Sequence, residues 1–195
     1  LIEVDGKTQA VCPGSGAVVA YEPETGQELW SVNYGEGYSV VPRPVFANGL
    51  VFVCSGFNSA SLYAIDPTGR GDVTETHVRW VVDKGIPKTP SLVAVGNELF
   101  VVDDGGVASC IDTKTGELHW KQRLGGKFSA SVFYGGGNLY FQSEDGKTTV
   151  VAPGTEFNEV ATNEIADGGR TFASFAVVDN DLLLRSEKYL YRIGR

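Results

Sequence analysis

Residues 20–30 read AYEPETGQELW, and residues 110–120 repeat that pattern as CIDTKTGELHW. Both copies share an acid at the third position, a Thr-Gly pair and a tryptophan that closes the segment. A third copy begins at Ala64 as AIDPTG, but its tryptophan, Trp80, follows an insertion of extra residues. All three tryptophans of the chain therefore occupy one equivalent position, which predicts a repeat architecture before any local structure is argued.

Short apolar segments recur around these motifs at a nearly constant distance. Candidate second strands begin at positions 8, 50, 99, 139 and 182, and a pair of turn residues precedes each one. Gly, Asn and Asp suit these turns because they tolerate the positive φ of a two-residue hairpin. The turn pairs are Asp5-Gly6, Asn48-Gly49, Gly96-Asn97, Gly136-Gly137 and Asn180-Asp181. Third strands are expected at 18–21, 62–65, 108–111, 149–152 and 190–193.

The fourth strand of each unit carries the tryptophan, and Val160 stands at the matching place of the fourth unit. Four short strands in about 40 residues, without a helical period, are typical of a propeller blade. We therefore predict an all-β fold, a β-propeller of four-stranded antiparallel blades that stack to bury their faces. The expected single domain spans 1–195, with blades at about 1–34, 35–84, 85–124, 125–165 and a partial fifth at 166–195.

The residues of the motif have structural explanations. The acid ends the third strand, where its carboxylate can accept backbone N–H bonds of the coming turn. The glycine supplies positive φ, and the tryptophan offers a flat face to the adjacent blade and an indole N–H to a carbonyl. We interpret these residues as blade scaffold, with an aromatic ligand cage as the alternative. They are Glu22, Gly26, Trp30, Asp66, Gly69, Trp80, Asp112, Gly116 and Trp120.

The composition is that of a folded acidic protein, with 42% hydrophobic residues and a net charge of −8. An acidic surface repels phosphate backbones, so nucleic acid is not an expected partner. No apolar run approaches the roughly 20 residues of a membrane helix, and the chain starts without a signal peptide. Because it begins at Leu1 and contains no methionine, we expect a piece of a longer protein, and this start is compatible with a removed export signal.

The Ala-x-Asp-x-x-x-Gly-x-x-x-Trp pattern resembles the tryptophan-docking motif of pyrroloquinoline-quinone-like (PQQ-like) propellers. This family includes the quinoprotein alcohol dehydrogenases and the outer-membrane assembly lipoprotein BamB. The resemblance covers essentially the whole chain, and residues 69–80 look like an insertion of uncharacterised exported bacterial members. It implies a ring of about eight blades, so the remaining blades of the parent propeller are expected partners. It also implies export to the periplasm or cell envelope of a bacterium.

The enzymes of this family hold their quinone beside a calcium ion and under a disulfide between adjacent cysteines. Cys12, Cys54 and Cys110 are not adjacent, and no Glu/Asn/Asp set matches the calcium ligands. We therefore expect no cofactor, no metal and no catalytic residue; a fragment of a PQQ-dependent oxidoreductase is the alternative. Nucleophile-elbow, zinc and phosphate-loop motifs do not occur in the sequence. The cysteines lie in apolar strand contexts, which favours buried, unpaired thiols.

Charged turns are the remaining candidates for function. Turns that join blades and turns between second and third strands should lie on one rim of a propeller, where they form a polar binding surface. The joining turns carry Asp83, Lys84, Lys88, Lys127, Asp167 and Arg170. The other turns carry Asp103, Asp104, Glu144, Asp145, Glu187 and Lys188. Ordinary solvated turns are the alternative interpretation.

Arg43 is a charge between two prolines in an apolar stretch, so it should line the axial channel or pair with a carboxylate. We predict a non-catalytic scaffold that binds a protein or polymer through its rim loops. The insertion Gly69–Arg79 is a second candidate for protein contact, and a sensor module attached to another domain is a further possibility. The axial and rim residues proposed for binding are Arg43, Lys88, Asp103, Asp104 and Arg170.

Overall fold

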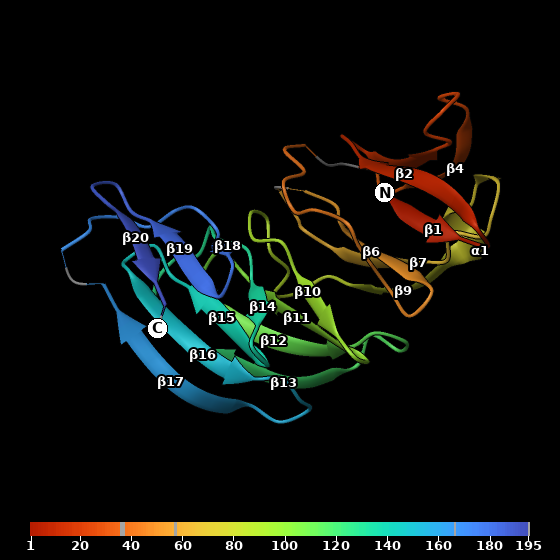
Figure 1. Cartoon of the computed structure of the whole chain (residues 1–195). Coiled ribbons are helices and arrows are strands. Elements are labelled where there is room, and N and C mark those ends of the chain that lie inside the picture. Colours follow the sequence, from red (N-terminus) through yellow and green to blue (C-terminus); the bar gives the residue numbers. More distant parts are fainter. Residues whose placement is uncertain (36–37, 57, 166, 195) are drawn as a thin grey trace. The chain divides into compact units, whose positions relative to one another are not determined.

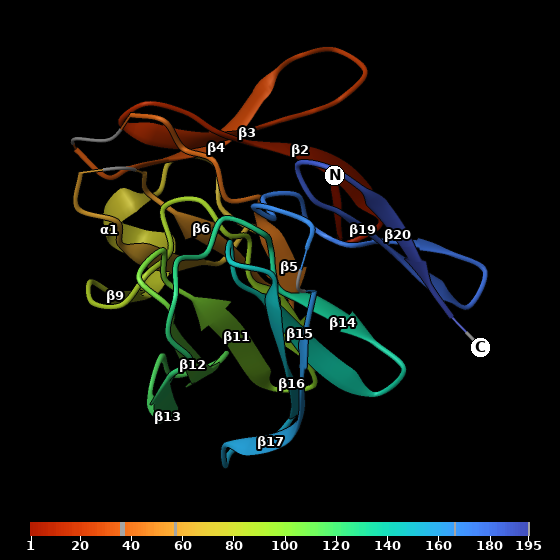
Figure 2. The same cartoon turned by 90° about the vertical axis from the view of Figure 1, so that its left-hand side faces the viewer.

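The computed structural model describes residues 1–35, 38–56, 58–165 and 167–194. Its strands form five sheets, and the predicted all-β architecture of four-stranded antiparallel blades is confirmed (Figures 1 and 2). The chain divides into two compact units: unit 1 is Leu1–Lys88 with Asp112–Glu117, and unit 2 is Thr89–Ile111 with Leu118–Arg195. The predicted limits of the fifth blade, 166 and 195, lie outside the described residues, as do 36, 37 and 57 within the predicted second blade.

Unit 1 contains blades 1 and 2. Blade 1 is built from β1 (Ile2–Val4), β2 (Lys7–Pro13), β3 (Ala17–Tyr21) and β4 (Glu28–Asn33), each hydrogen-bonded to the next. Blade 2 is built from β5 (Val45–Ala47), β6 (Leu50–Cys54), β7 (Leu62–Ile65) and β9 (Val78–Val82). The insertion between β7 and β9 forms β8 (Gly71–Asp72) and a single helical turn, α1 (Thr74–His77). This helical turn could not be predicted from hydrophobic periodicity, because four residues are too few to show a helical period.

Unit 2 contains blades 4 and 5 and most of blade 3, whose segment Asp112–Glu117 belongs to unit 1. Blade 3 is built from β10 (Val93–Val95), β11 (Glu98–Val102), β12 (Val107–Asp112) and β13 (Leu118–Arg123). Blade 4 is built from β14 (Phe133–Gly135), β15 (Asn138–Gln142), β16 (Lys147–Ala152) and β17 (Asn158–Glu164). Blade 5 has the three strands β18 (Ala176–Val178), β19 (Asp181–Arg185) and β20 (Leu190–Ile193) within the described residues.

Two-residue turns close the first hairpin of the blades, and their φ angles explain the choice of residue. Asp5 and Gly6 have φ of 49° and 73°, and Asn48 and Gly49 have 52° and 78°. The last turn lies one residue earlier than predicted, at 179–180, because Val178 pairs with Asp181 and Asp179 has φ of 54°. Asp and Asn both tolerate this conformation, so residue type alone could not distinguish the two registers.

The tryptophans end rows of side chains that cross the blades. In blade 2 the row is Phe52, Ala64 and Trp80, three residues paired across neighbouring strands. Cross-strand partners point to the same face of a sheet, and the small central residue leaves room for aromatic rings on both sides. The Phe52 and Trp80 rings lie 5.6 Å apart. Blade 3 repeats this arrangement, with Cys110 paired to Trp120 and the Phe100 ring 6.0 Å from the indole.

Each indole N–H donates a hydrogen bond, but through two different routes. Trp80 Nε1 donates to the Thr113 carbonyl at 3.1 Å, and Trp120 Nε1 donates to the Gly154 carbonyl at 2.9 Å. Trp30 Nε1 instead donates to the Gln9 side-chain oxygen at 2.7 Å. The Gln9 amide then donates to the Pro67 carbonyl at 3.3 Å. Pro67 directly follows the motif acid Asp66, as Thr113 directly follows Asp112. The buried Gln9 side chain therefore links the Trp30 indole to the same position of the next motif turn that Trp80 contacts directly.

The position that corresponds to tryptophan in blade 4 is Ala161, and the prediction of Val160 is wrong. Val150 pairs with Ala161 across the sheet, as Cys110 pairs with Trp120. Eleven residues separate that pair in blade 4 and ten in blade 3, because the β16–β17 turn is one residue longer. Val160 falls in the bulge and is 55% exposed. Blade 4 therefore has a methyl group where the other complete blades have an indole.

Replacing Trp120 with Ala should lower the free energy of unfolding by about 3–5 kcal/mol, because it empties a buried aromatic site. Urea denaturation measures this directly. The matched control is Val160→Ala, in the equivalent strand of blade 4, which should change stability by less than about 0.5 kcal/mol. A loss below about 1 kcal/mol for Trp120→Ala would show that the indole is not a packing element.

Replacing Gln9 with Leu should cost about 1–3 kcal/mol, because the Trp30 N–H and the Pro67 carbonyl lose their partner. The cost should be smaller when Trp30 is already Phe, since the buried donor is then absent. A double-mutant cycle in urea measures the coupling of the two side chains. Additive effects would contradict the relay.

Candidate functional site

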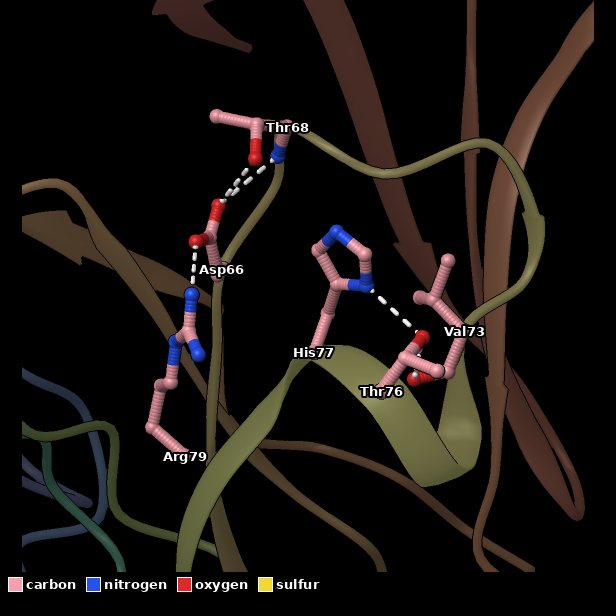
Figure 3. A network of polar contacts seen from close by, with 6 residues as sticks. All are labelled: Asp66, Thr68, Val73, Thr76, His77 and Arg79. Atoms are coloured by element: carbon pink, nitrogen blue, oxygen red, sulfur yellow. Dashed lines mark hydrogen bonds and ion pairs between the residues drawn. The ribbon is translucent and has the colours of Figure 1, made fainter.

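The insertion between β7 and β9 carries its own polar network (Figure 3). The Asp66 carboxylate accepts hydrogen bonds from the Thr68 backbone at 3.0 Å and from the Thr68 hydroxyl at 2.7 Å. Its second oxygen pairs with the Arg79 guanidinium at 2.5 Å. Burial acts to raise the pKa of Asp66, but these donors outweigh it and hold the pKa below its ordinary value. The network closes the base of the insertion.

The tip of the insertion packs on blade 1. Its strand β8 pairs in parallel with β4, which places Gly71 beside Trp30 and Asp72 beside Ser31. The next N–H, from Val73, donates to the Ser31 carbonyl at 2.9 Å, and the Val73 side chain is only 2% exposed in the apolar cluster around Trp30. The segment predicted as a candidate for external protein contact thus contributes part of its length to the core of unit 1.

Charged turns lie side by side along one edge of unit 2, and we call this edge the rim. It comprises residues 103–106, 125–129, 143–146, 167–172 and 186–188. Backbone hydrogen bonds connect the blade-joining turns to the turns between second and third strands. Phe128 N donates to the Asp104 carbonyl at 3.1 Å, Glu144 N to Lys127 at 2.7 Å, and Glu187 N to Arg170 at 2.9 Å. The rim is therefore fixed by main-chain contacts that recur from blade to blade.

Arg170 and Glu144 form the central ion pair of the rim. Arg170 donates through Nε at 2.8 Å and through NH2 at 2.5 Å to one Glu144 oxygen, while the Ser129 hydroxyl donates to the other. Burial acts to raise the pKa of Glu144, but Ser129 and Arg170 together keep the pKa below its usual range. Glu144 is thus a fixed carboxylate anchor that orients the half-exposed Arg170 side chain.

An exposed aromatic ring accompanies this ion pair. The Arg170 guanidinium lies 4.8 Å from the centre of the Phe172 ring, and Phe172 is 55% exposed. A shallow pocket of about 360 Å³ opens beside it. Its lining residues are Gly126, Lys127, Glu144, Asp145 and Arg170. Phe172 was missed in the sequence, where its position two residues after Arg170 in a joining turn was the available signal.

The remaining predicted site residues lie in different places. Asp103 accepts the Val107 N–H at 2.9 Å, so it shapes its own turn, and the neighbouring Asp104 contributes its carbonyl to the rim. Lys88 belongs to unit 1 and is half-buried. Arg43, also in unit 1, lines a pocket of about 470 Å³ with Glu3 and residues of β1 and β5. The structure brings Arg170 and Asp104 to one edge and assigns Arg43 to a separate pocket.

The motif residues surround the tryptophan contacts. Asp112 accepts the Lys114 and Thr115 N–H groups at 2.8 Å, whereas Glu22 accepts the Thr25 hydroxyl at 2.5 Å. Gly26 and Gly116 have φ of 72° and 75°. Gly69 is required for another reason: an added Cβ would lie 2.6 Å from the Val73 side chain.

The residues present do not fit a quinone–calcium centre. Among the described residues, no three His, Cys, Asp or Glu side chains gather in a way that could hold a metal ion. Cys54 and Cys110 are buried as expected, but Cys12 is exposed, because Val11 and not Cys12 belongs to the row that ends at Trp30. The sequence pattern could not reveal which of two adjacent strand residues faces the core.

A model of the family described as outer membrane protein assembly factor BamB matches residues 2–84 and 60–159. This chain belongs to the BamB family of PQQ-like propellers. A curated relative, the outer membrane protein assembly factor BamB of Alkalilimnicola ehrlichii, is 30% identical over 155 residues. The match covers 77% of this chain and 39% of the relative, so the chain spans well under half of that protein's length.

Two solved structures share the fold at low sequence identity. BamB from Moraxella catarrhalis aligns with a TM-score of 0.68 at 16% identity, covering 92% of this chain and 55% of that one. The quinohemoprotein alcohol dehydrogenase ADHIIG from Pseudomonas putida HK5 aligns with a TM-score of 0.63 at 15% identity, covering 80% and 29%. In the described part of this chain, no helix has the length and apolar character required to cross a membrane.

Replacing Asp66 with Asn should destabilise unit 1 at pH 7. The difference in stability between the variant and the unsubstituted chain should disappear as the pH is lowered. The folded-state pKa of Asp66 is lowered, so its stabilisation is complete above the unfolded-state pKa of about 4 and is lost as the pH falls through the folded value. Thermal unfolding between pH 7 and 2.5 measures this. Glu24→Gln, at an exposed turn carboxylate, is the control. A gap that stays constant with pH would contradict the role of the Asp66 charge.

Proposed function

We propose that this chain is a non-catalytic part of a propeller scaffold, and that it binds a protein or polymer through the rim of unit 2. Family membership supports a scaffold role in this coarse sense. The observation that carries the proposal is the Glu144–Arg170–Phe172 assembly. It combines an oriented cation, an exposed aromatic ring and a shallow pocket on turns that are already ordered.

Pre-ordered turns favour binding because little side-chain and loop entropy remains to be lost on association. Arg and aromatic residues are also the side chains that most often dominate protein interfaces. The Glu144 carboxylate holds the guanidinium in place, while the neighbouring Lys127 leaves the pocket with both signs of charge. A partner segment that carries an acidic group next to an apolar one would complement this surface.

The relatives support a cellular setting for this binding. The curated relative is named as an assembly factor for outer membrane proteins. We extend this to the chain as a proposal: it acts in the periplasm or cell envelope of a bacterium, within a longer protein whose other blades complete the propeller. Because the residues do not fit a quinone–calcium centre, the proposed function includes no redox step.

A photo-crosslinking amino acid placed at Phe172 should capture a discrete partner in cells that produce the parent protein. The same amino acid at Lys121, exposed on the outer strand β13, is the matched control. Adding Arg170→Glu should abolish the Phe172 adduct without lowering the amount of protein, since it reverses the charge at the centre of the rim. Identical adducts from both positions, or an adduct that survives Arg170→Glu, would refute rim binding. Saturable binding of the quinone in the presence of calcium, measured by absorbance, would refute the proposal that this chain binds no quinone cofactor.

A further inference from the structure

The segment Arg170–Phe172 of the rim rests on a buried group of polar side chains. Thr171, the residue between the two exposed ones, is only 1% exposed. The Gln142 amide donates to the Thr171 hydroxyl at 3.1 Å, and that hydroxyl donates to the Ser143 carbonyl at 2.6 Å. The Thr148 hydroxyl donates to the Gln142 side-chain oxygen at 2.5 Å, and Gln142 is itself 1% exposed. The group thus joins blade 4 to the turn that leads into blade 5.

The equivalent boundary, between blades 3 and 4, is apolar. The strand pairings of the two blades identify the residues that correspond to Gln142 and Thr148. The residue that corresponds to Thr171 follows from the N–H bond that each joining turn donates to a turn of the preceding blade. All three polar residues have apolar counterparts, which lie together in one buried cluster. The pairs are Val102 and Gln142, Ala108 and Thr148, and Phe128 and Thr171.

This exchange is coupled to the side chain that each joining turn exposes. Adjacent residues of an extended segment point to opposite sides. The turn before blade 4 reads Lys127-Phe128-Ser129, so its aromatic ring is buried and its serine donates to Glu144. The turn before blade 5 reads Arg170-Thr171-Phe172, so its hydroxyl is buried and its ring lies outside, 4.8 Å from the guanidinium. An aromatic residue and a hydroxyl residue have exchanged places between the two turns.

The Gln142 side chain makes the buried position of the Thr171 hydroxyl favourable. A hydroxyl taken out of water is stable only where hydrogen-bond partners replace the water. The two N–H groups of the Gln142 amide donate to the Thr171 hydroxyl and to the Ser143 carbonyl, each at 3.1 Å. The bond from Thr148 to the amide oxygen fixes the orientation of that amide. A valine, the residue at the equivalent position 102, would offer no donor.

We infer that Gln142 is a positioning residue of the rim site. By holding Thr171 inward, it places the two flanking side chains outside, where they stack on each other and face a partner. The inference rests on the proposed function of the rim, because this positioning serves binding only if the stacked pair of Arg170 and Phe172 contacts the partner. Gln142 lies buried behind the turn, so it acts through Thr171 and not by contact with the partner.

Nuclear magnetic resonance of the 195-residue chain tests the positioning directly. The Phe172 ring should shift the Arg170 side-chain signals upfield relative to those of the Phe172→Leu variant. Gln142→Leu should remove most of this shift, whereas Gln9→Leu should retain it. Gln9 is the matched control because it is a buried, hydrogen-bonded glutamine of unit 1, so that a general loss of stability affects both variants. If Gln142→Leu does not fold, Thr171→Val, which removes the hydroxyl at nearly the same shape, takes its place.

Photo-crosslinking in cells that produce the parent protein tests the consequence for binding. A crosslinking amino acid at Lys127, which lines the rim pocket, should capture a discrete partner. Gln142→Leu should abolish this adduct, and Gln9→Leu should leave it unchanged. An Arg170 shift that survives Gln142→Leu, or an adduct that persists after the stacking is lost, would overturn the inference. Loss of the stacking as expected, with no adduct even when Gln142 is present, would count against the proposed function and leave the positioning role standing.

Discussion

The docking of a tryptophan side chain on the motif turn of the next repeat is the interaction on which the rest of this structure depends. Three requirements meet at Trp80. A small residue, Ala64, must stand beside the indole in the row; a carbonyl, that of Thr113, must accept its N–H; and a residue without a side chain must lie under the ring. Gly116 meets the last requirement, since a Cβ there would lie 2.8 Å from the indole. The motif residues thus form one contact between neighbouring repeats: one repeat supplies the tryptophan, and the next supplies the carbonyl and the glycine.

The chain modifies this contact in ways that have consequences elsewhere. Trp30 reaches the Pro67 carbonyl through the Gln9 amide, and the same boundary gains an added strand and the buried Val73 from the insertion. At blade 4 the position of the indole is occupied by Ala161. The proposed binding surface lies elsewhere, where charged turns converge at the rim.

Much of the fold could be predicted because propeller repeats combine short-range signals that agree with one another. The turn chemistry at Asp5-Gly6 and Asn48-Gly49 and the recurring motif both constrain the strands to within about two residues. The pairing register of individual strands was harder to predict. One additional residue in the β16–β17 turn places the tryptophan position at Ala161 and not at Val160. The last hairpin turn lies at 179–180, one residue earlier than predicted, because Asp and Asn both tolerate positive φ. The exposure of Cys12 was also a matter of register, because adjacent residues of a strand face opposite sides of the sheet and a shift of one residue exchanges them.

The candidate site was less predictable, because it depends on contacts between residues far apart in sequence. The sequence placed Arg170 and Glu144 in the right classes of turn, but their pairing and the stacking on Phe172 required the geometry of two blades. The insertion had no repeat to compare with, so its return to β4 could not be foreseen.

The cost of Gly116→Ala, measured by urea denaturation with Trp80 present and with Trp80 replaced by Ala, tests the central contact most directly. The positive φ of Gly116 makes the substitution unfavourable in both backgrounds, by about 1 kcal/mol. With the indole present, the added methyl group also collides with the ring, so the account predicts a coupling of about 0.5–3 kcal/mol between the two positions. An equal cost in both backgrounds would contradict the claim that the tryptophan docks on this glycine.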